Sequence, residues 1–147
     1  MSAIVRLVGT LVLLLAATAV QAQNEVPTDR ELEALVKGSL LTLNDANVTG
    51  NYSVLHAKLS RPFREQFSIE QFRAAFKQFR VENTDYDIIA VMQPAYDPRP
   101  SISEDGKLVV NGSFPTEPSR VRFDLEFIPS EGQWKLIAIQ VKMVPQS

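Results

Sequence analysis

The chain contains no cysteine, and histidine occurs once among its 147 residues. Without cysteine there is no disulfide framework, no thiolate metal site and no cysteine nucleophile. A single histidine excludes a zinc centre built mainly from histidines. The sequence also lacks a glycine-rich phosphate loop, a Gly-x-Ser-x-Gly elbow and an acidic calcium loop. These absences disfavour nucleotide-binding proteins, serine hydrolases and EF-hand proteins, and the sequence gives no reason to expect a metal or a cofactor.

The longest apolar run lies at the N-terminus, from Leu7 to Ala17. It is followed by Val20-Gln21-Ala22, whose small residues fit a cleavage site, so residues 1–22 are predicted to be a secretory signal peptide. The run is too short to span a hydrocarbon core of about 30 Å comfortably, which argues against stable membrane insertion after cleavage. We therefore expect a periplasmic or secreted protein with a single domain over residues 23–147.

The charge balance of this domain is slightly acidic. Arg6 is the one basic residue of the predicted signal, so 14 basic residues remain against 17 acidic ones, and the net charge becomes −3. Nucleic acid or an anionic membrane surface would require a basic patch, and we expect neither as a partner. Hydrophobic residues make up 45% of the chain and charged residues 22%, a composition typical of a globular domain with a packed core.

The first part of the domain carries helical patterns. Thr28 and Glu31 form a capping box, because the threonine oxygen can accept from the third backbone N–H while the glutamate reaches back. Apolar residues then recur every three or four positions, which predicts a helix that ends near Asn47, before Gly50. A short second helix is predicted over residues 52–59.

A second capping box, Ser68 with Gln71, predicts a third helix. Its apolar stripe is expected to pack into the core and consists of Ile69, Phe72, Phe76 and Phe79. Basic side chains on the other side of this helix are Arg73, Lys77 and Arg80. We interpret that side as a solvated face on which Glu70 pairs with Arg73.

After Asn83 the apolar period changes from nearly four to two, and β-branched and aromatic residues replace alanine and leucine. A first strand is predicted over residues 87–93. Asp105-Gly106 marks a hairpin that follows a short proline-rich edge segment. Three longer strands are predicted to form an antiparallel meander, over residues 107–114, 120–128 and 134–144.

The last of these strands is apolar on both alternations. We expect Ile137, Ile139 and Val141 on one face, and the other face is formed by Trp134, Leu136 and Ala138. Because only one face can cover the helices, the other would leave an apolar patch exposed in a monomer. The pattern therefore predicts a homodimer formed across the outer face of the sheet.

Helices followed by an antiparallel meander predict an α+β domain in which a curved sheet of about five strands packs around three N-terminal helices. Within this order, five segments carry a resemblance to a known superfamily: Leu41–Asp45, Gly50–Ser53, Phe63–Phe67, Arg120–Phe127 and Gly132–Val141. Together they resemble the nuclear-transport-factor-like cone fold, the superfamily that includes ketosteroid isomerase and many small dehydratases. More narrowly, the chain resembles a group of exported bacterial proteins of unassigned role.

The resemblance implies a cavity between helices and sheet, and it is also consistent with a homodimer. Our candidate binding residues for this cavity are Tyr52, His56, Phe76 and Tyr86. Ketosteroid isomerase uses a tyrosine and two buried acids, and no acids here match those positions, so we assign no catalytic residue. The superfold hosts enzymes, binding modules and interaction domains alike, so the resemblance implies no single activity.

Two interpretations of the candidate residues stay open. Histidine is the residue type best suited to proton transfer near neutral pH, and His56 lies one helical turn after Tyr52, so the two could supply a base and a hydrogen-bond donor. In the other interpretation a backbone carbonyl satisfies His56 and Tyr52 packs with its hydroxyl at the rim. Asp85 and Asp87 could likewise supply a carboxylate base, or they are solvated turn residues.

We therefore expect a non-catalytic binding module for a small apolar ligand or a protein. The alternative is a small isomerase or dehydratase that works by proton transfer. The cavity separates the two, because an enzyme requires converging polar groups in an enclosed apolar pocket, whereas a binding module can have a filled interior.

Overall fold

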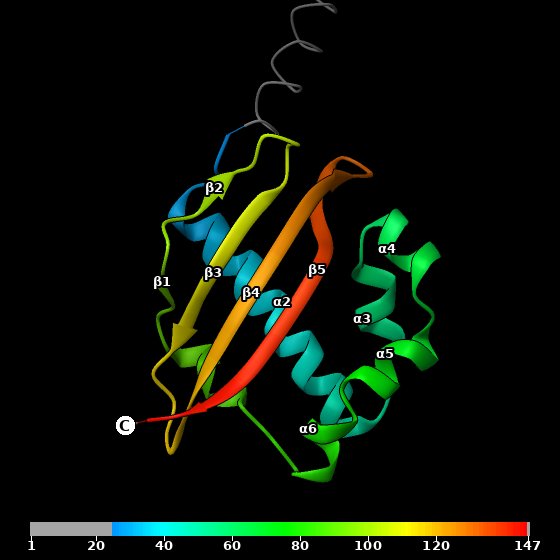
Figure 1. The fold of residues 1–147 in the computed structure, drawn as a ribbon, viewed down its shortest axis with the longest axis vertical. Helices are drawn as coiled ribbons and strands as arrows, with labels where there is room; N and C mark the ends of the chain where they lie inside the picture. Colours follow the sequence, from blue (N-terminus) through cyan, green and yellow to red (C-terminus); the bar gives the residue numbers. More distant parts are fainter. Residues whose placement is uncertain (1–24, 147) are drawn as a thin grey trace, which may run out of the picture.

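The computed structural model describes residues 25–146, which form an α+β domain with helices first and an open antiparallel sheet after them (Figure 1). The predicted signal peptide lies outside the described residues. The helices are α2 (Asp29–Thr49), α3 (Ser53–Lys58), α4 (Arg61–Gln66), α5 (Ile69–Ala75), α6 (Lys77–Val81) and the 3₁₀ helix η1 (Asp87–Val91). The strands are β1 (Ala95–Tyr96), β2 (Ser101–Ile102), β3 (Leu108–Phe114), β4 (Ser119–Ser130) and β5 (Gln133–Pro145). Across residues 25–146, no helix has both the length and the apolar character needed to cross a membrane.

Helix α2 begins and ends as its sequence predicts. The Thr28 hydroxyl accepts from the backbone N–H of Glu31, and the Glu31 carboxylate accepts from the backbone N–H of Thr28 at 2.8 Å. At the other end Gly50 adopts a left-handed conformation with φ of 75° and donates its N–H to the Ala46 carbonyl. Both devices satisfy backbone groups that a helix end leaves free, which explains why local sequence determines these boundaries.

Five α-helices occupy the region where three were predicted. Pro62 stands in the first turn of α4, and the capping box of Ser68 with Gln71 is present at the start of α5. The predicted third helix is divided at Phe76, whose φ of −105° and ψ of 17° interrupt the helical path between α5 and α6. The change of direction allows Arg80 to donate a hydrogen bond back to the Arg73 carbonyl at 2.7 Å.

The strand predicted over residues 87–93 is wrong, because η1 occupies most of it. Contacts with α2 explain the difference. The Asn44 side chain accepts from the backbone N–H of Tyr86, Lys37 donates to the Ala90 carbonyl, and the Ile89 side chain is fully buried. These tertiary contacts outweigh the strand preference of β-branched residues, which is weak and depends on context.

The sheet has the order β1-β3-β4-β5, with β2 also paired to β3. The predicted hairpin at Asp105-Gly106 is confirmed, since β2 and β3 pair antiparallel on either side of it. The predicted meander is confirmed as β3, β4 and β5, which pair in sequence order. Strand β5 consequently lies at the end of the sheet.

A bulge in β5 overturns the predicted faces of that strand. Leu136 pairs with Phe127, whereas Ile139 pairs with Leu125, so the register shifts by one residue at Ile137. One extra residue reverses the alternation of everything beyond it. The side chains that consequently share the helix-facing side of β5 are Trp134, Leu136, Ile139, Val141 and Met143.

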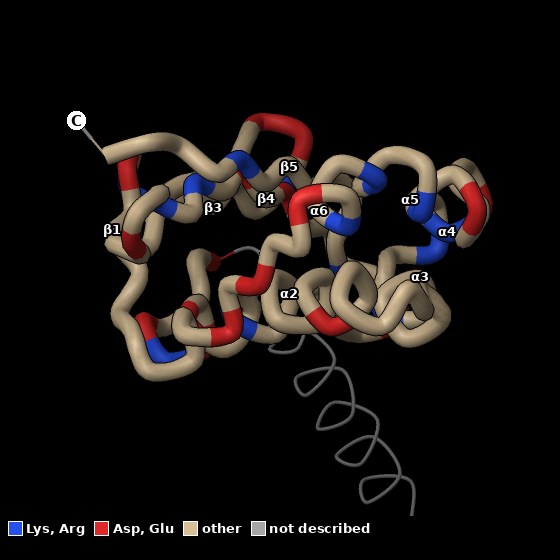
Figure 2. Tube along the Cα trace, turned by 90° about the horizontal axis from the view of Figure 1, so that it is seen from below, with Lys and Arg blue, Asp and Glu red and all other residues tan. Residues whose placement is uncertain are grey.

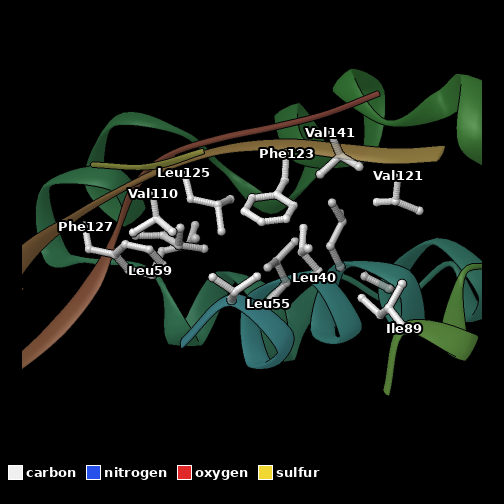
Figure 3. Close-up of a cluster of buried hydrophobic side chains, with 14 of the residues drawn as sticks. Leu40, Leu55, Leu59, Ile89, Val110, Val121, Phe123, Leu125, Phe127 and Val141 are labelled. Carbon is white, nitrogen blue, oxygen red and sulfur yellow. The ribbon is translucent and has the colours of Figure 1, made fainter. Parts of the chain in front are cut away.

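The core lies between α2 and the inner face of the sheet, as two layers (Figures 2 and 3). Figure 3 shows side chains of α2 and α3 facing those of β4 across this space. Phe72 and Phe76 of the predicted apolar stripe are buried, as are Phe123 and Phe127 of β4. Ile69 of that stripe is exposed, so the stripe packs into the core only in part. Helices α4 and α5 lie beside β5 and not beneath it, so a second, smaller apolar contact forms at the sheet edge (Figures 1 and 2).

Candidate functional site

An apolar groove separates β5 from helices α4 and α5. We call it the edge groove; its volume is about 320 Å³, and it is lined by Phe63, Phe67, Gln71, Phe72, Ala75, Phe76, Ile137, Ala138 and Ile139. Gln71 is the one polar side chain of this lining, and its Oε1 already accepts from the Ser68 backbone N–H. The surface that a ligand would contact in this groove is therefore almost entirely apolar and offers almost no hydrogen-bonding partner.

Three contacts hold α4 beside the sheet and so keep the groove in shape. The Ser60 N–H donates to the Leu136 carbonyl at 2.9 Å, across the gap between the start of α4 and β5. The Arg61 N–H donates to the Ser130 hydroxyl at 3.2 Å. Arg64 forms an ion pair with Glu131 in the turn between β4 and β5.

The groove wall on the helical side is a cluster of phenylalanines. The Phe63 ring centroid lies 5.1 Å from that of Phe72 and 5.5 Å from that of Phe67, and Phe72 stacks toward Phe76 at 6.5 Å. Such offset and edge-to-face pairs hold each ring in a definite orientation. Phe67 is still 38% exposed, which is unusual for a phenylalanine and leaves an aromatic surface open to a ligand.

Of the four candidate binding residues, Phe76 is the one that lines the edge groove. His56 lies behind the groove wall, where its Nε2 lies 2.8 Å from the Phe67 carbonyl oxygen and its ring meets Phe72 edge-on at 6.2 Å. The interpretation in which a backbone carbonyl satisfies His56 is confirmed by this contact. No carboxylate pairs with His56 within residues 25–146.

Tyr52 belongs to a separate polar cluster. Its hydroxyl donates to Asn47 Oδ1 and accepts from Arg80 Nη1 at 2.7 Å, and the Arg80 guanidinium carbon lies 5.5 Å from the centre of its ring. The side chain is 1% exposed, so the hydroxyl is not at a rim as one interpretation placed it. The Tyr52 hydroxyl and the His56 ring thus serve different partners.

Tyr86 is buried to the same degree, and its hydroxyl has no hydrogen-bond partner in the described part of the chain. Burial raises the pKa of Tyr86 well above its usual range, with smaller contributions from Tyr52 and Asp45. The hydroxyl therefore stays protonated at any physiological pH. The neighbouring Asp85 and Asp87 are exposed at the start of η1, where Asp85 Oδ1 accepts from the Asp87 N–H at 3.1 Å.

The basic stripe is a solvated face only in part, because Arg73 and Lys77 are exposed and Arg80 is not. Arg73 donates to the Gly50 carbonyl, and Arg80 is half-buried against Tyr52. No ion pair joins Glu70 to Arg73 in the described residues. Helical spacing alone could not reveal this arrangement, because it depends on the interruption at Phe76.

Other contributors to the edge groove were also missed. Phe63 and Phe67 lie one helical turn apart, a spacing that marks one face of a helix, but the sequence does not show which element that face meets. Within residues 25–146, no three His, Cys, Asp or Glu side chains gather closely enough to hold a metal ion.

Comparison with known proteins identifies no relative of this chain. No protein-family model matches this chain, and no curated protein or solved structure matches it either.

Proposed function

We propose that this chain is a non-catalytic binding module that holds an uncharged, apolar small molecule in the edge groove. The observation that carries the proposal is the lining itself, which combines four phenylalanines with four aliphatic positions of α5 and β5 and contains no titratable side chain. Because burying an unpaired charge is costly, the part of a ligand that enters this groove is uncharged.

Binding fits this lining better than proton transfer does. General acid–base catalysis needs a titratable group within about 2.6–3.2 Å of the transferred proton, or one water away. The edge groove offers none. His56 is turned to a backbone carbonyl behind the wall, and the Tyr52 hydroxyl is already engaged at both its donor and its acceptor positions.

The setting of this activity is also a proposal. The N-terminal sequence supports export to the periplasm or the medium, with cleavage after Ala22. The order of helices before an antiparallel sheet supports kinship with the cone-fold superfamily, within which non-catalytic binding domains are known.

Titration with the neutral fluorophore N-phenyl-1-naphthylamine tests the proposed ligand class. We expect a saturable rise in fluorescence, because the probe leaves water for the phenylalanine wall. Ala75→Trp fills the groove and should weaken binding by about tenfold or more, which corresponds to about 1.4 kcal/mol.

The matched control is Ala74→Trp, an exposed position of the same helix that does not line the groove, and it should retain the affinity of the parent. Circular dichroism establishes that both variants are folded. Equal affinities in the two variants, or fluorescence that never saturates, would show that the edge groove is not the binding site.

A further inference from the structure

A second, polar cleft lies where the end of α2 meets α6 and the turn that follows it. Its volume is about 380 Å³, and it shares no lining residue with the edge groove. The residues that matter here are Asn47, Val48, Phe79, Arg80 and Asp85. A volume of this size is at the low end of the range for ligand pockets, which suits a ligand of few atoms.

Two opposite charges line this cleft without neutralising each other. Neither Arg80 nor Asp85 takes part in an ion pair among residues 25–146. Arg80 uses Nη1 for the Tyr52 hydroxyl and the Arg73 carbonyl, and its Nη2 and Nε have no hydrogen bond there. Both side chains thus keep charge available to a ligand that brings the opposite sign.

A buried donor without a partner lies at the same place. Asn47 is 5% exposed, and its Oδ1 accepts from the Tyr52 hydroxyl. Its Nδ2 is buried and has no hydrogen bond within the described residues, although Asn47 lines the cleft. A buried amide N–H without a hydrogen bond destabilises the folded protein, and a ligand oxygen that accepts from Nδ2 would remove this destabilisation.

The anionic side of the cleft is held in position from α2. Asp85 Oδ1 accepts from Asn44 Nδ2 at 2.8 Å, and Asn44 Oδ1 accepts from the Tyr86 N–H at 3.0 Å. Asp85 Oδ2 has no hydrogen bond or ion pair within residues 25–146.

We infer that this cleft is a binding site for a small zwitterion of the free α-amino acid class. The ligand carboxylate would meet Arg80 and Asn47 Nδ2, and its ammonium group would meet Asp85. The apolar side chain of such a ligand would contact Phe79 and Val48, which also line the cleft. The inference does not depend on the edge groove.

NMR titration of the ¹⁵N-labelled chain with L-leucine tests this site. The matched probes are 4-methylpentanoate, which lacks the amino group, and 3-methylbutylamine, which lacks the carboxylate. We expect saturable shifts of the Asn47 side-chain amide with L-leucine, and binding of each single-charge probe weaker by about tenfold, since each loses one charged hydrogen bond.

The variant Asp85→Asn keeps the oxygen that accepts from Asn44 and removes the charge. It should weaken L-leucine binding to the level of 4-methylpentanoate and should not weaken the binding of 4-methylpentanoate, which has no ammonium group to lose a partner. The control Asp124→Asn, on the outer sheet face, should change neither affinity.

Three outcomes would overturn the inference: L-leucine binds no better than either probe, Asp85→Asn affects L-leucine and 4-methylpentanoate equally, or no saturable shift occurs up to roughly 10 mM. Such a result would leave the proposal for the edge groove untouched, because that proposal is tested with a neutral probe and with variants at other positions.

Discussion

At the residue scale, Glu131 shows how one exposed side chain ties a turn to a helix. Its carboxylate lies 2.5 Å from Arg64 Nη2 and 2.8 Å from Lys135 Nζ, so it connects the β4–β5 turn to α4 beside the edge groove. Hydrogen bonds from Lys135 and Arg64 lower the pKa of Glu131 from 4.5 to about 2. The folded state therefore favours the ionised carboxylate more than the unfolded chain does.

This difference predicts a pH dependence of stability. A lowered folded-state pKa contributes stability above the unfolded value of 4.5, and that contribution is lost as the pH falls from about 4.5 to about 2. Glu131→Gln should consequently melt below the parent at pH 7, and the two melting temperatures should converge by pH 2.

The control is Glu104→Gln, which removes an exposed carboxylate that has no ion pair in the described residues. Its melting temperature should follow the parent at both pH values. If Glu131→Gln also follows the parent at pH 7, the two ion pairs contribute nothing measurable, as is common for exposed pairs.

The polar cluster around Tyr52 illustrates a different principle at this scale. Asn47 lies in α2, Tyr52 directly precedes α3 and Arg80 lies in α6, and each satisfies another polar group away from water. Buried polar atoms carry a cost unless they are paired, so such a cluster specifies one arrangement of α2, α3 and α6. The cation is held by a hydroxyl and a carbonyl, and not by an acid.

At the scale of elements, the short strand β1 depends on a residue of β3 that has no side chain. Gly112 lies opposite Tyr96, and a Cβ on Gly112 would sit 2.2 Å from the Ala95 carbonyl oxygen and 3.0 Å from the Phe123 ring. To relieve this contact the backbone of β1 would have to move, because the nearest atom belongs to the main chain and not to a flexible side chain. The β1–β3 pairing therefore requires glycine at this position.

Gly112→Ala should lower the free energy of unfolding by about 1–3 kcal/mol, the usual cost of overpacking a filled site. Gly38→Ala is the matched control, since Gly38 lies inside α2 and nothing lies within 4 Å of the added methyl group. That variant should gain about 0.5–1 kcal/mol from the loss of glycine's conformational freedom. Urea denaturation measures both, and a neutral Gly112→Ala would mean that β1 is not held against β3.

The β4–β5 hairpin shows an element whose geometry its own residues determine. Glu131 and Gly132 form a two-residue turn with φ of 56° and 80°, which suits the twist of the flanking strands. The bulge at Ile137 lies a few residues beyond it. That bulge turns Ile139 and Val141 to the same side as Leu136, and this produces one apolar face on β5 where two were predicted.

At the scale of the whole molecule, the bulge removes the reason for which a homodimer was predicted. Leu136 and Trp134 belong to the helix-facing side, and Ala138 is paired with Glu126 on the outer face. The side chains around it on that face are mainly polar: Arg122, Asp124, Glu126, Gln140 and Lys142. The dimer across the outer face stays a prediction, now without an apolar patch to support it.

Light scattering at high micromolar concentration tests that prediction. A mass twice that of the chain, reduced by Ala138→Glu at the centre of the outer face, would support it. The charge introduced there should disfavour close packing of two copies while leaving the inner core untouched. A strictly monomeric mass of the parent would contradict it.

The two proposed sites lie at contacts between different pairs of elements. The edge groove forms where α4 and α5 meet the free side of β5, and the polar cleft forms where α2 ends against α6. Neither lies among the buried side chains that pack between α2 and the middle of the sheet (Figure 3). Both proposed sites therefore lie at the margins of the core and not in the central cavity that the cone-fold resemblance implied.

The sequence by itself determined the features whose causes are local. The capping boxes, the glycine after α2, the hairpin at Asp105-Gly106 and the alternation in β4 each act within a few residues, so helix starts and the meander were predictable. The buried phenylalanines followed from the same periodicities.

Tertiary structure decided the rest, because the competing local preferences there are weak. Hydrogen bonds from Asn44 and Lys37 of α2 stabilise η1 where the sequence predicted a strand. The interruption of the helix at Phe76 allows Arg80 to contact Tyr52. One extra residue in β5 reverses which side chains of that strand face the helices. Both proposed sites are made from residues that are distant in sequence. Only the packing of separate elements could bring four phenylalanines to a sheet edge, or place Arg80 and Asp85 in one cleft.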